Sequence, residues 1–261
     1  MSGEFLKNLF GLEGQATVVI GGTGVLGGAL CEGLAQAGAL VVVAGRSRDR
    51  GEQRVEAIRA LGAEATFAPV EAASRESVEQ LLATTIEQHG RVDCLVNCAG
   101  VNHASGYLDA PDDQWDRVLE TNLKATHLGC QVFGAHMAAT DGGGAILNIG
   151  SVTSSRPLSR VFAYSASKAA VINLTQNVGR ELAPQGVRVN ALCPGFFPAE
   201  QNRKILDEQR VANIMQHTPM NRFGEPHELV GAALLLLSQN AGSFMTGAVV
   251  YVDGGFTAMT F

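Results

Sequence analysis

The chain has 261 residues, of which 46% are hydrophobic and 17% are charged, and its formal net charge at pH 7 is −6. This length and apolar content predict one domain, residues 1–261, with a core that needs no disulfide or metal. The acidic balance argues against nucleic acids and anionic membranes as partners, because both bind clustered lysine and arginine. We therefore expect a small-molecule substrate.

The five cysteines are scattered and form no C-x-x-C pair, so the sequence indicates neither a zinc site nor a secreted disulfide framework. We expect a reducing, cytoplasmic environment and no bound metal. The first fourteen residues lack the apolar core of a signal peptide, and the longest apolar run covers only residues 229–237. That run is about half the length needed to span a bilayer, so we expect no membrane segment.

Seven short apolar runs predict β-strands, and longer segments with helical spacing separate them. The runs cover residues 17–20, 40–44, 65–68, 94–96, 145–149, 187–192 and 248–252. The clearest helices are predicted over residues 74–89 and 163–182. Nearly continuous apolar strands are expected when helices cover both faces of a parallel sheet. We predict a doubly wound α/β Rossmann fold with a mostly parallel sheet of about seven strands.

A glycine-rich segment follows the first predicted strand and precedes a predicted helix. Gly22, Gly24 and Gly27 satisfy the pattern G-x-G-x-x-G. Glycines at these positions permit a tight turn and let backbone N–H groups approach a pyrophosphate. A glycine-rich turn without a ligand is the alternative. The position between strand and helix favours a dinucleotide site in the N-terminal half.

The end of the second predicted strand bears on which dinucleotide is bound. A carboxylate usually binds the ribose hydroxyls of NAD there, but the sequence reads Ala44-Gly45-Arg46. Arg46, with Arg48 or Arg50 nearby, could hold a 2′-phosphate through its planar guanidinium. The alternative is that these arginines only begin a solvated helix. We expect NADP, with NAD as the second choice.

A tyrosine and a lysine four residues apart begin the predicted helix 163–182. Tyr164 and Lys168 lie on one face of that helix. We expect the lysine to lower the pKa of the tyrosine, which would suit proton transfer near neutral pH. Ser151 follows a strand at the carboxyl edge of the sheet, where ligands of such folds bind. Each residue alone could be structural, but together they indicate a catalytic site.

Over essentially its whole length the chain resembles the short-chain dehydrogenase/reductase family. The resemblance rests on the segments GGTGVLGG, NCAG, ETNLKA, YSASK, NALCPG and VYVDGG, and on Ser151. It implies hydride transfer between a nicotinamide and a carbonyl or alcohol carbon. Tyr164 would be the acid/base, Ser151 would orient the substrate oxygen, and Lys168 would bind the nicotinamide ribose. Asn122 would hold a water that relays protons from Lys168.

The resemblance also implies a set of cofactor contacts and three departures from the family pattern. The implied cofactor residues are Gly21, Gly22, Gly24, Leu26, Gly27, Arg46, Glu71, Asn97, Ala99, Gly100, Tyr164, Lys168, Pro194 and Gly195. Val25 stands where the family usually has glycine, and Ile20 and Ala199 stand where it usually has threonine. The departures concern fine cofactor contacts rather than the reaction.

The loops expected above the sheet are polar, which favours a hydroxylated substrate. We predict substrate contacts from Asn102, His103, Arg156, Glu200 and Arg203, within loops that include a substrate lid around residues 194–220. Segments such as RPL and EQNR resemble the branch that reduces fructuronate and related sugar acids, which implies a sugar acid or polyol-like substrate. The alternative is that EQNRK merely begins a charged lid helix.

Two other functions remain open at this stage. A 3-oxoacyl thioester reductase would share the catalytic residues but would favour a basic entrance for its carrier. A nicotinamide-binding regulator would keep the fold without catalysis. The family resemblance further implies a homotetramer built through helices around residues 113–138 and 163–182 and through the C-terminal segment.

Overall fold

A computed structural model describes residues 2–197 and 208–259 of the chain. Within this part, one parallel sheet has seven strands in the order β3-β2-β1-β4-β5-β6-β7. The strands are β1 Ala16–Ile20, β2 Leu40–Gly45, β3 Ala65–Pro69, β4 Cys94–Asn97, β5 Gly144–Ile149, β6 Val187–Pro194 and β7 Val249–Val252. The prediction of a doubly wound parallel sheet is confirmed. The strand order reverses between β1 and β4, and ligands of such sheets bind outside the carboxyl ends of strands at that point.

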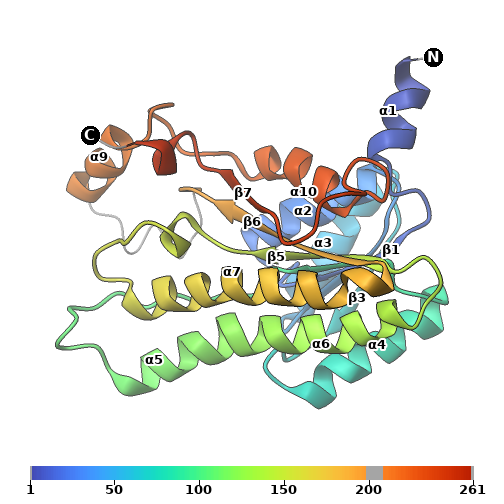
Figure 1. The fold of residues 1–261 in the computed structure, drawn as a ribbon, viewed down its shortest axis with the longest axis horizontal. Helices are drawn as coiled ribbons and strands as arrows, with labels where there is room; N and C mark the ends of the chain where they lie inside the picture. Colours follow the sequence, from blue (N-terminus) through green and yellow to red (C-terminus); the bar gives the residue numbers. More distant parts are fainter. Residues whose placement is uncertain (1, 198–207, 260–261) are drawn as a thin grey trace.

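Helices cover both faces of the sheet (Figure 1). The α-helices are α1 Ser2–Phe10, α2 Val25–Gln36, α3 Arg48–Ala60, α4 Arg75–His89, α5 Asp112–Leu119, α6 Ala125–Ala138, α7 Phe162–Leu182, α9 Glu208–Gln216 and α10 Val230–Leu237. Shorter turns are η1 Glu120–Lys124, η2 Val152–Ser154, η3 Ala183–Gln185, η4 Pro226–Leu229 and η5 Phe256–Ala258. Among the described helices, none is long and apolar enough to cross a membrane.

Two hydrophobic clusters fill the space between the sheet and the helix layers. One joins the sheet to α2, α3 and α10, and the other joins it to α4, α6 and α7. The strands between them are buried on both sides; every residue of β1 and β4 is buried. This double burial explains why the strands are recognisable as apolar runs in the sequence.

Local signals set the helix ends. Ser74 caps α4 by accepting a hydrogen bond at its hydroxyl from the Ser77 N–H at 3.3 Å. Gly90 ends the same helix in a left-handed conformation with φ of 78°. The observed α4 and α7 begin and end within one residue of the predicted helices.

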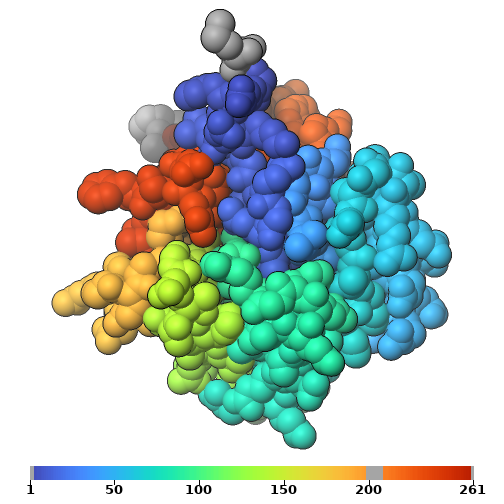
Figure 2. Space-filling model, turned by 90° about the vertical axis from the view of Figure 1, so that its right-hand side faces the viewer, coloured from blue at the N-terminus to red at the C-terminus, as the bar shows by residue number. Residues whose placement is uncertain are grey.

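The N-terminal helix is held against the segment that follows α10. The Ser238 hydroxyl donates to the Leu9 carbonyl at 2.7 Å, and the Asn240 amide donates to the Asn8 carbonyl at 2.6 Å. Figure 2 shows the dark blue N-terminal segment lying between the red C-terminal region and the lighter blue region. A hollow of about 1150 Å³ lies between α1, α2 and α10, and it is lined by none of the predicted site residues.

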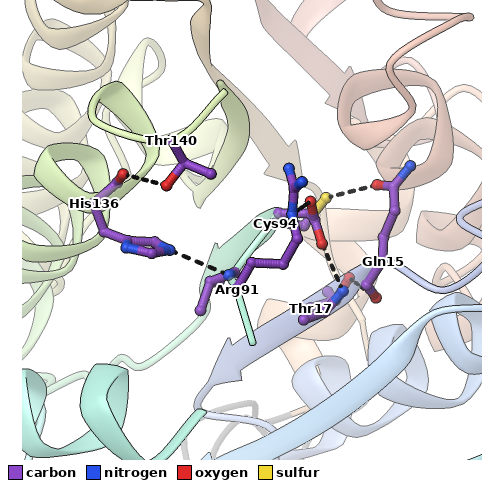
Figure 3. Close-up of polar contacts among 9 residues, drawn as sticks. Gln15, Thr17, Arg91, Cys94, His136 and Thr140 are labelled. Atoms are coloured by element: carbon purple, nitrogen blue, oxygen red, sulfur yellow. Dashed lines mark hydrogen bonds and ion pairs between the residues drawn. The ribbon is translucent and has the colours of Figure 1, made fainter. Parts of the chain in front are cut away.

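A polar network lies at the amino-terminal edge of β1 and β4 (Figure 3). The Asp93 carboxylate accepts from the Ala16 N–H at 2.9 Å and forms an ion pair with Arg91 at 2.6 Å. Nearby, the Nε2 atom of His136 accepts from the Val92 N–H at 3.3 Å. Burial, and then the charge of Arg91, lower the pKa of His136 from its usual value of 6.5. The imidazole is therefore neutral at pH 7, as its acceptor role requires.

Acidification is expected to weaken this network through His136. Because the folded-state pKa is below the unfolded value of 6.5, the stabilisation is complete above 6.5 and is lost as pH falls through the folded-state pKa. We expect the free energy of unfolding to decrease slightly between pH 7 and 5 through this group, because the imidazole is partly exposed and solvent screens its interactions. Urea unfolding at several pH values would measure it.

Two variants of helix α6 separate this effect from general acid sensitivity. His136→Gln should lack this component of the pH dependence, whereas His127→Gln, at an exposed position of the same helix, should keep it. If the free energy of unfolding depended on pH equally in wild type and His136→Gln, the role assigned to this imidazole would be contradicted.

Candidate active site

A cleft of about 610 Å³ opens at the carboxyl edge of the sheet. Its lining comes from the glycine-rich loop after β1, from α3, from the segments after β4, β5 and β6, and from α7 and α9. The sites predicted from separate sequence motifs thus contribute to one cavity. Its position agrees with the ligand-binding edge expected for this topology.

The glycine-rich loop packs its backbone closely against neighbouring backbone. Gly21 has a φ of +91°, and a Cβ at this position would lie 2.6 Å from the Ala99 nitrogen. A Cβ at Gly27 would collide with the Gly21 carbonyl. Gly24 caps α2 with extended backbone, so the N-terminus of this helix adjoins the cleft. This arrangement fits a pyrophosphate, because the three glycines leave the backbone of the loop accessible and the helix end favours negative charge.

The departure at Val25 is compatible with this arrangement. Val25 is the first residue of α2, lines the cleft and is 41% exposed, so its side chain displaces no buried group. Leu26, the next residue, also lines the cleft and packs partly against the core.

The basic end of the cleft differs in detail from the sequence-based expectation. Arg46 is exposed and does not line the cleft; the lining side chains in this region are Arg50, Gln53 and Arg54 of α3. Arg54 also forms an ion pair with Glu32 of α2. A Cβ at Gly45 would lie 2.7 Å from the Thr23 hydroxyl, so a larger residue at the end of β2 would crowd the loop. Arg54 was not predicted from the sequence. Its spacing of four residues from Arg50 is the signal that could have placed both side chains on one face of α3.

Lys168 is buried beside the tyrosine of its own helix. Its side chain is 4% exposed, its Nζ atom donates to the Ile149 carbonyl at 2.7 Å, and Nζ lies 5.8 Å from the Tyr164 ring centre. Burial lowers the pKa of Lys168 from 10.5 to about 8. Lys168 therefore loses its proton more readily here than a lysine on the protein surface does.

The expectation of a lowered tyrosine pKa is wrong for this structure. Burial raises the pKa of Tyr164 above its usual value of 10.0, and a hydrogen bond with Ser151 opposes this rise without cancelling it. Desolvation disfavours the phenolate more than nearby groups stabilise it. Tyr164 therefore holds its proton at neutral pH and is suited to donate it.

Ser151 begins the short turn η2, which is hydrogen-bonded to α7. Ser151 caps η2, and its hydroxyl accepts from the Thr153 N–H at 3.2 Å. The Ser154 hydroxyl accepts from the Ser151 N–H at 3.2 Å and donates to the Lys168 carbonyl at 3.0 Å. Ser154 thus links the end of β5 to α7 and holds Ser151 beside Tyr164 and Lys168.

Asn122 lies in a π-helical turn between α5 and α6. Its fully buried side chain accepts from the Val101 N–H at 2.8 Å and donates to the Val101 carbonyl and the Ser167 hydroxyl, both at 3.0 Å. A Cβ at Gly100 would lie 3.4 Å from the Asn122 side-chain oxygen and 3.7 Å from Lys168 Nζ. Asn122 therefore joins the segment after β4 to α7 close to Lys168, and π turns of this kind are frequent at functional sites.

Some predicted cofactor residues lie beside the cleft rather than on its surface. Asn97 is buried and donates to the Asn148 side chain at 2.9 Å, so it supports the sheet. Glu71 is exposed and does not line the cleft, and Pro194 ends β6 just before the lining residue Gly195. The backbone of Ala99 contacts the glycine-rich loop.

The predicted substrate residues are only partly brought together. Asn102 lines the cleft, whereas His103 is half-buried outside the lining. Arg156 is exposed and donates to the Thr257 carbonyl at 2.8 Å, so it contacts the C-terminal turn. Glu200 and Arg203, like Ala199, lie outside the described residues. Thr153, Phe196 and Arg210 also line the cleft on this side. The sequence did not single them out individually, although Phe196 and Arg210 fall within the predicted lid around residues 194–220.

Comparison with known proteins decides the family. A family model described as enoyl-(acyl carrier protein) reductase matches residues 24–257. A 5-keto-D-gluconate 5-reductase of Escherichia coli is 32% identical, over 96% of this chain and 98% of the relative. The chain belongs to the short-chain dehydrogenase/reductase family. It is an oxidoreductase of this family, as its sequence predicted.

Further relatives within the short-chain dehydrogenase/reductase family include sugar-acid enzymes. A gluconate 5-dehydrogenase of Gluconobacter oxydans is 34% identical, over 96% of this chain and 97% of the relative. A gluconate 5-dehydrogenase of Burkholderia cenocepacia, whose crystal structure contains NADP and tartrate, is 31% identical with a TM-score of 0.92. The match covers 97% of this chain and 99% of the other. The fold described above is therefore shared with an enzyme whose crystal structure contains NADP.

Proposed function

We propose that the protein interconverts a ketone and a secondary alcohol on a sugar acid of the gluconate type. The observation that carries the proposal is the cleft itself, which joins Ser151, Tyr164 and Lys168 to polar side chains and to an arginine of α9. The names of relatives such as 5-keto-D-gluconate 5-reductase support the same substrate class. A hydroxylated acid suits a lining of this polarity.

The catalytic residues divide the chemistry between them. Tyr164 gives its proton to the carbonyl oxygen in reduction and takes it back in oxidation. Ser151 donates a hydrogen bond to that same oxygen and so orients the substrate. Lys168 binds the nicotinamide ribose, and Asn122, which joins the segment after β4 to α7, supports the proton path from Lys168. When bound, the nicotinamide supplies or accepts the hydride.

We propose that the cofactor is NADP(H) in preference to NAD(H). The residues directly after β2 are Arg46 and Ser47 rather than a carboxylate, and α3 contributes Arg50 and Arg54 to the lining of the cleft. A guanidinium forms charge-assisted hydrogen bonds with a 2′-phosphate, and these are stronger than its hydrogen bonds with the neutral 2′-hydroxyl of NAD. Solved relatives that contain NADP support this preference.

Removing one arginine is expected to weaken NADPH use selectively. We expect Arg50→Ala to raise the KM for NADPH roughly tenfold while leaving the KM for NADH unchanged, because the variant loses a charge-assisted hydrogen bond. Steady-state kinetics with both cofactors would measure this. Arg48→Ala is the matched control, because Arg48 pairs with Glu52 at 3.3 Å and lies over the Phe67 ring. Equal losses with NADH and NADPH would refute 2′-phosphate recognition.

A substrate panel tests the reaction. Uronates, aldonates, polyols and acetoacetyl thioesters would each be assayed with NADPH and NADH. We expect the highest kcat/KM on a keto sugar acid. Activity confined to the thioesters would instead identify a 3-oxoacyl thioester reductase. NADPH binding with no turnover of any carbonyl would indicate a nicotinamide-binding regulator.

We also propose a cytoplasmic homotetramer. All five cysteines carry free thiols, which fits a reducing compartment. Large apolar side chains are exposed at and before α5, with Tyr107 at 67%, Leu108 at 94% and Trp115 at 37% exposure. Exposed apolar groups of this size favour burial against another subunit. Size-exclusion chromatography with light scattering would test the assembly, and a monomer would refute it.

A further inference from the structure

Two buried polar atoms in the lining of the cleft lack a hydrogen-bond partner. They are the side-chain oxygens of Asn102 and Thr153. Thr153 is only 7% exposed, so water reaches its hydroxyl poorly. Buried polar atoms are nearly always paired, and leaving one unpaired costs free energy. Both residues line the cavity that Tyr164 also lines, so a molecule bound there is the natural partner for these oxygens.

Thr153 is fixed relative to the catalytic serine. Its backbone N–H donates to the Ser151 hydroxyl at 3.2 Å, and it lies inside η2, whose start is capped by the same serine. A group bound by the Thr153 hydroxyl therefore lies close to the reacting oxygen. Asn102, two residues after Gly100, belongs to the segment that Asn122 anchors through Val101.

An arginine lines the same cleft as these two residues. Arg210 of α9 lines the cleft and donates to the Ser159 carbonyl at 3.0 Å. The neighbouring Arg160 has a φ of +69°, and its carbonyl accepts from the Ser105 N–H at 3.0 Å. The loop after β4, the loop after η2 and α9 are thus tied together. The guanidinium of Arg210 therefore belongs to the same cleft as Asn102 and Thr153, whose side-chain oxygens are unpaired.

We propose that Asn102, Thr153 and Arg210 form the specificity subsite for a hydroxylated carboxylic acid. Arg210 binds the substrate carboxylate, the Asn102 oxygen accepts from a substrate hydroxyl, and the Thr153 hydroxyl bonds a second one. The proposal rests on the proposed sugar-acid function and assigns the residues that select that class. An acyl chain in the same place would leave Asn102 and Thr153 unpaired, and that penalty would select against thioesters.

The test uses the NADP-dependent oxidation of D-gluconate and of its neutral counterpart D-gluconamide. We expect Arg210→Met to lower kcat/KM for D-gluconate roughly 100-fold and for D-gluconamide much less, so that the preference for the acid disappears. Arg210→Lys should retain part of the preference for the acid, because lysine keeps the positive charge but lacks the planar guanidinium that binds a carboxylate through two hydrogen bonds. Thr153→Val should lower kcat/KM roughly tenfold for both compounds, mainly through KM, because both carry the hydroxyls.

Controls separate recognition from folding. Thr85→Val makes the same atomic change at a buried position of α4, where the hydroxyl donates to the Leu81 carbonyl at 2.8 Å, and it should leave both substrates unaffected. The KM for NADPH should be unchanged in all variants. An Arg210→Met enzyme that keeps the wild-type ratio of the two substrates would overturn the subsite while leaving the proposed function intact. A wild-type enzyme inactive on every sugar acid would refute both.

Discussion

Tyr164→Phe is expected to reduce kcat for ketone reduction by about a thousandfold, the range expected for loss of a positioned acid. The ring and its burial are kept, so the cleft retains its shape and only the transferable proton is lost. The KM for NADPH should stay near the wild-type value, and circular dichroism should show an unchanged fold. Residual activity within tenfold of wild type would mean that another group donates the proton.

The direction of the Tyr164 pKa shift also fixes the pH profile. Because burial raises this pKa, the phenol remains protonated at neutral pH and reduction needs no further protonation there. Alcohol oxidation needs the phenolate as base, so its rate should rise with pH into the alkaline range. Measuring kcat in both directions from pH 6 to 10 would show this contrast, and Tyr164→Phe should flatten it.

Lys168→Met is expected to reduce kcat by about a hundredfold and to change how stability depends on pH. The folded-state pKa is lowered from 10.5 to about 8, so the lysine costs stability at neutral pH. Its contribution becomes more favourable as pH rises through this window, because the unfolded chain holds the proton longer.

The stability of wild type relative to Lys168→Met should therefore rise by about 2 kcal/mol between pH 7.5 and 10. Urea unfolding of both proteins at these two pH values would measure the difference. Methionine preserves the apolar stem but leaves the Ile149 carbonyl without the Nζ donor, and this loss does not depend on pH. A difference between the two proteins that stays constant with pH would show that Lys168 is not desolvated in the folded state.

The strands and the catalytic motif were predictable because each leaves a direct mark on the sequence. A strand buried on both faces is an apolar run, and residues one helical turn apart share a face, as Tyr164 and Lys168 do. The carboxyl edge of a parallel sheet then gathers segments that are far apart in the chain.

The remaining features depend on three-dimensional surroundings that the sequence does not encode locally. The π turn at Asn122 has no compositional signal, and the sign of the Tyr164 pKa shift is decided by burial rather than by the spacing to Lys168. The contact between Arg156, predicted as a substrate residue, and the C-terminal turn also has no signal in the sequence. The sequence does not single out Thr153, and only the structure shows that its hydroxyl is buried without a hydrogen-bond partner and that this residue lines the cleft.

The contact between Arg156 and the C-terminal turn affects how the protein should be prepared. Arg156 binds the Thr257 carbonyl, Tyr251 binds Ser155 at 3.0 Å, and Phe256 packs against Phe196 with ring centres 5.1 Å apart. Residues 251–257 therefore support the turn after β5 and Phe196, which lines the cleft. A purification tag before α1 is the better choice, because α1 lies well away from this region (Figure 1).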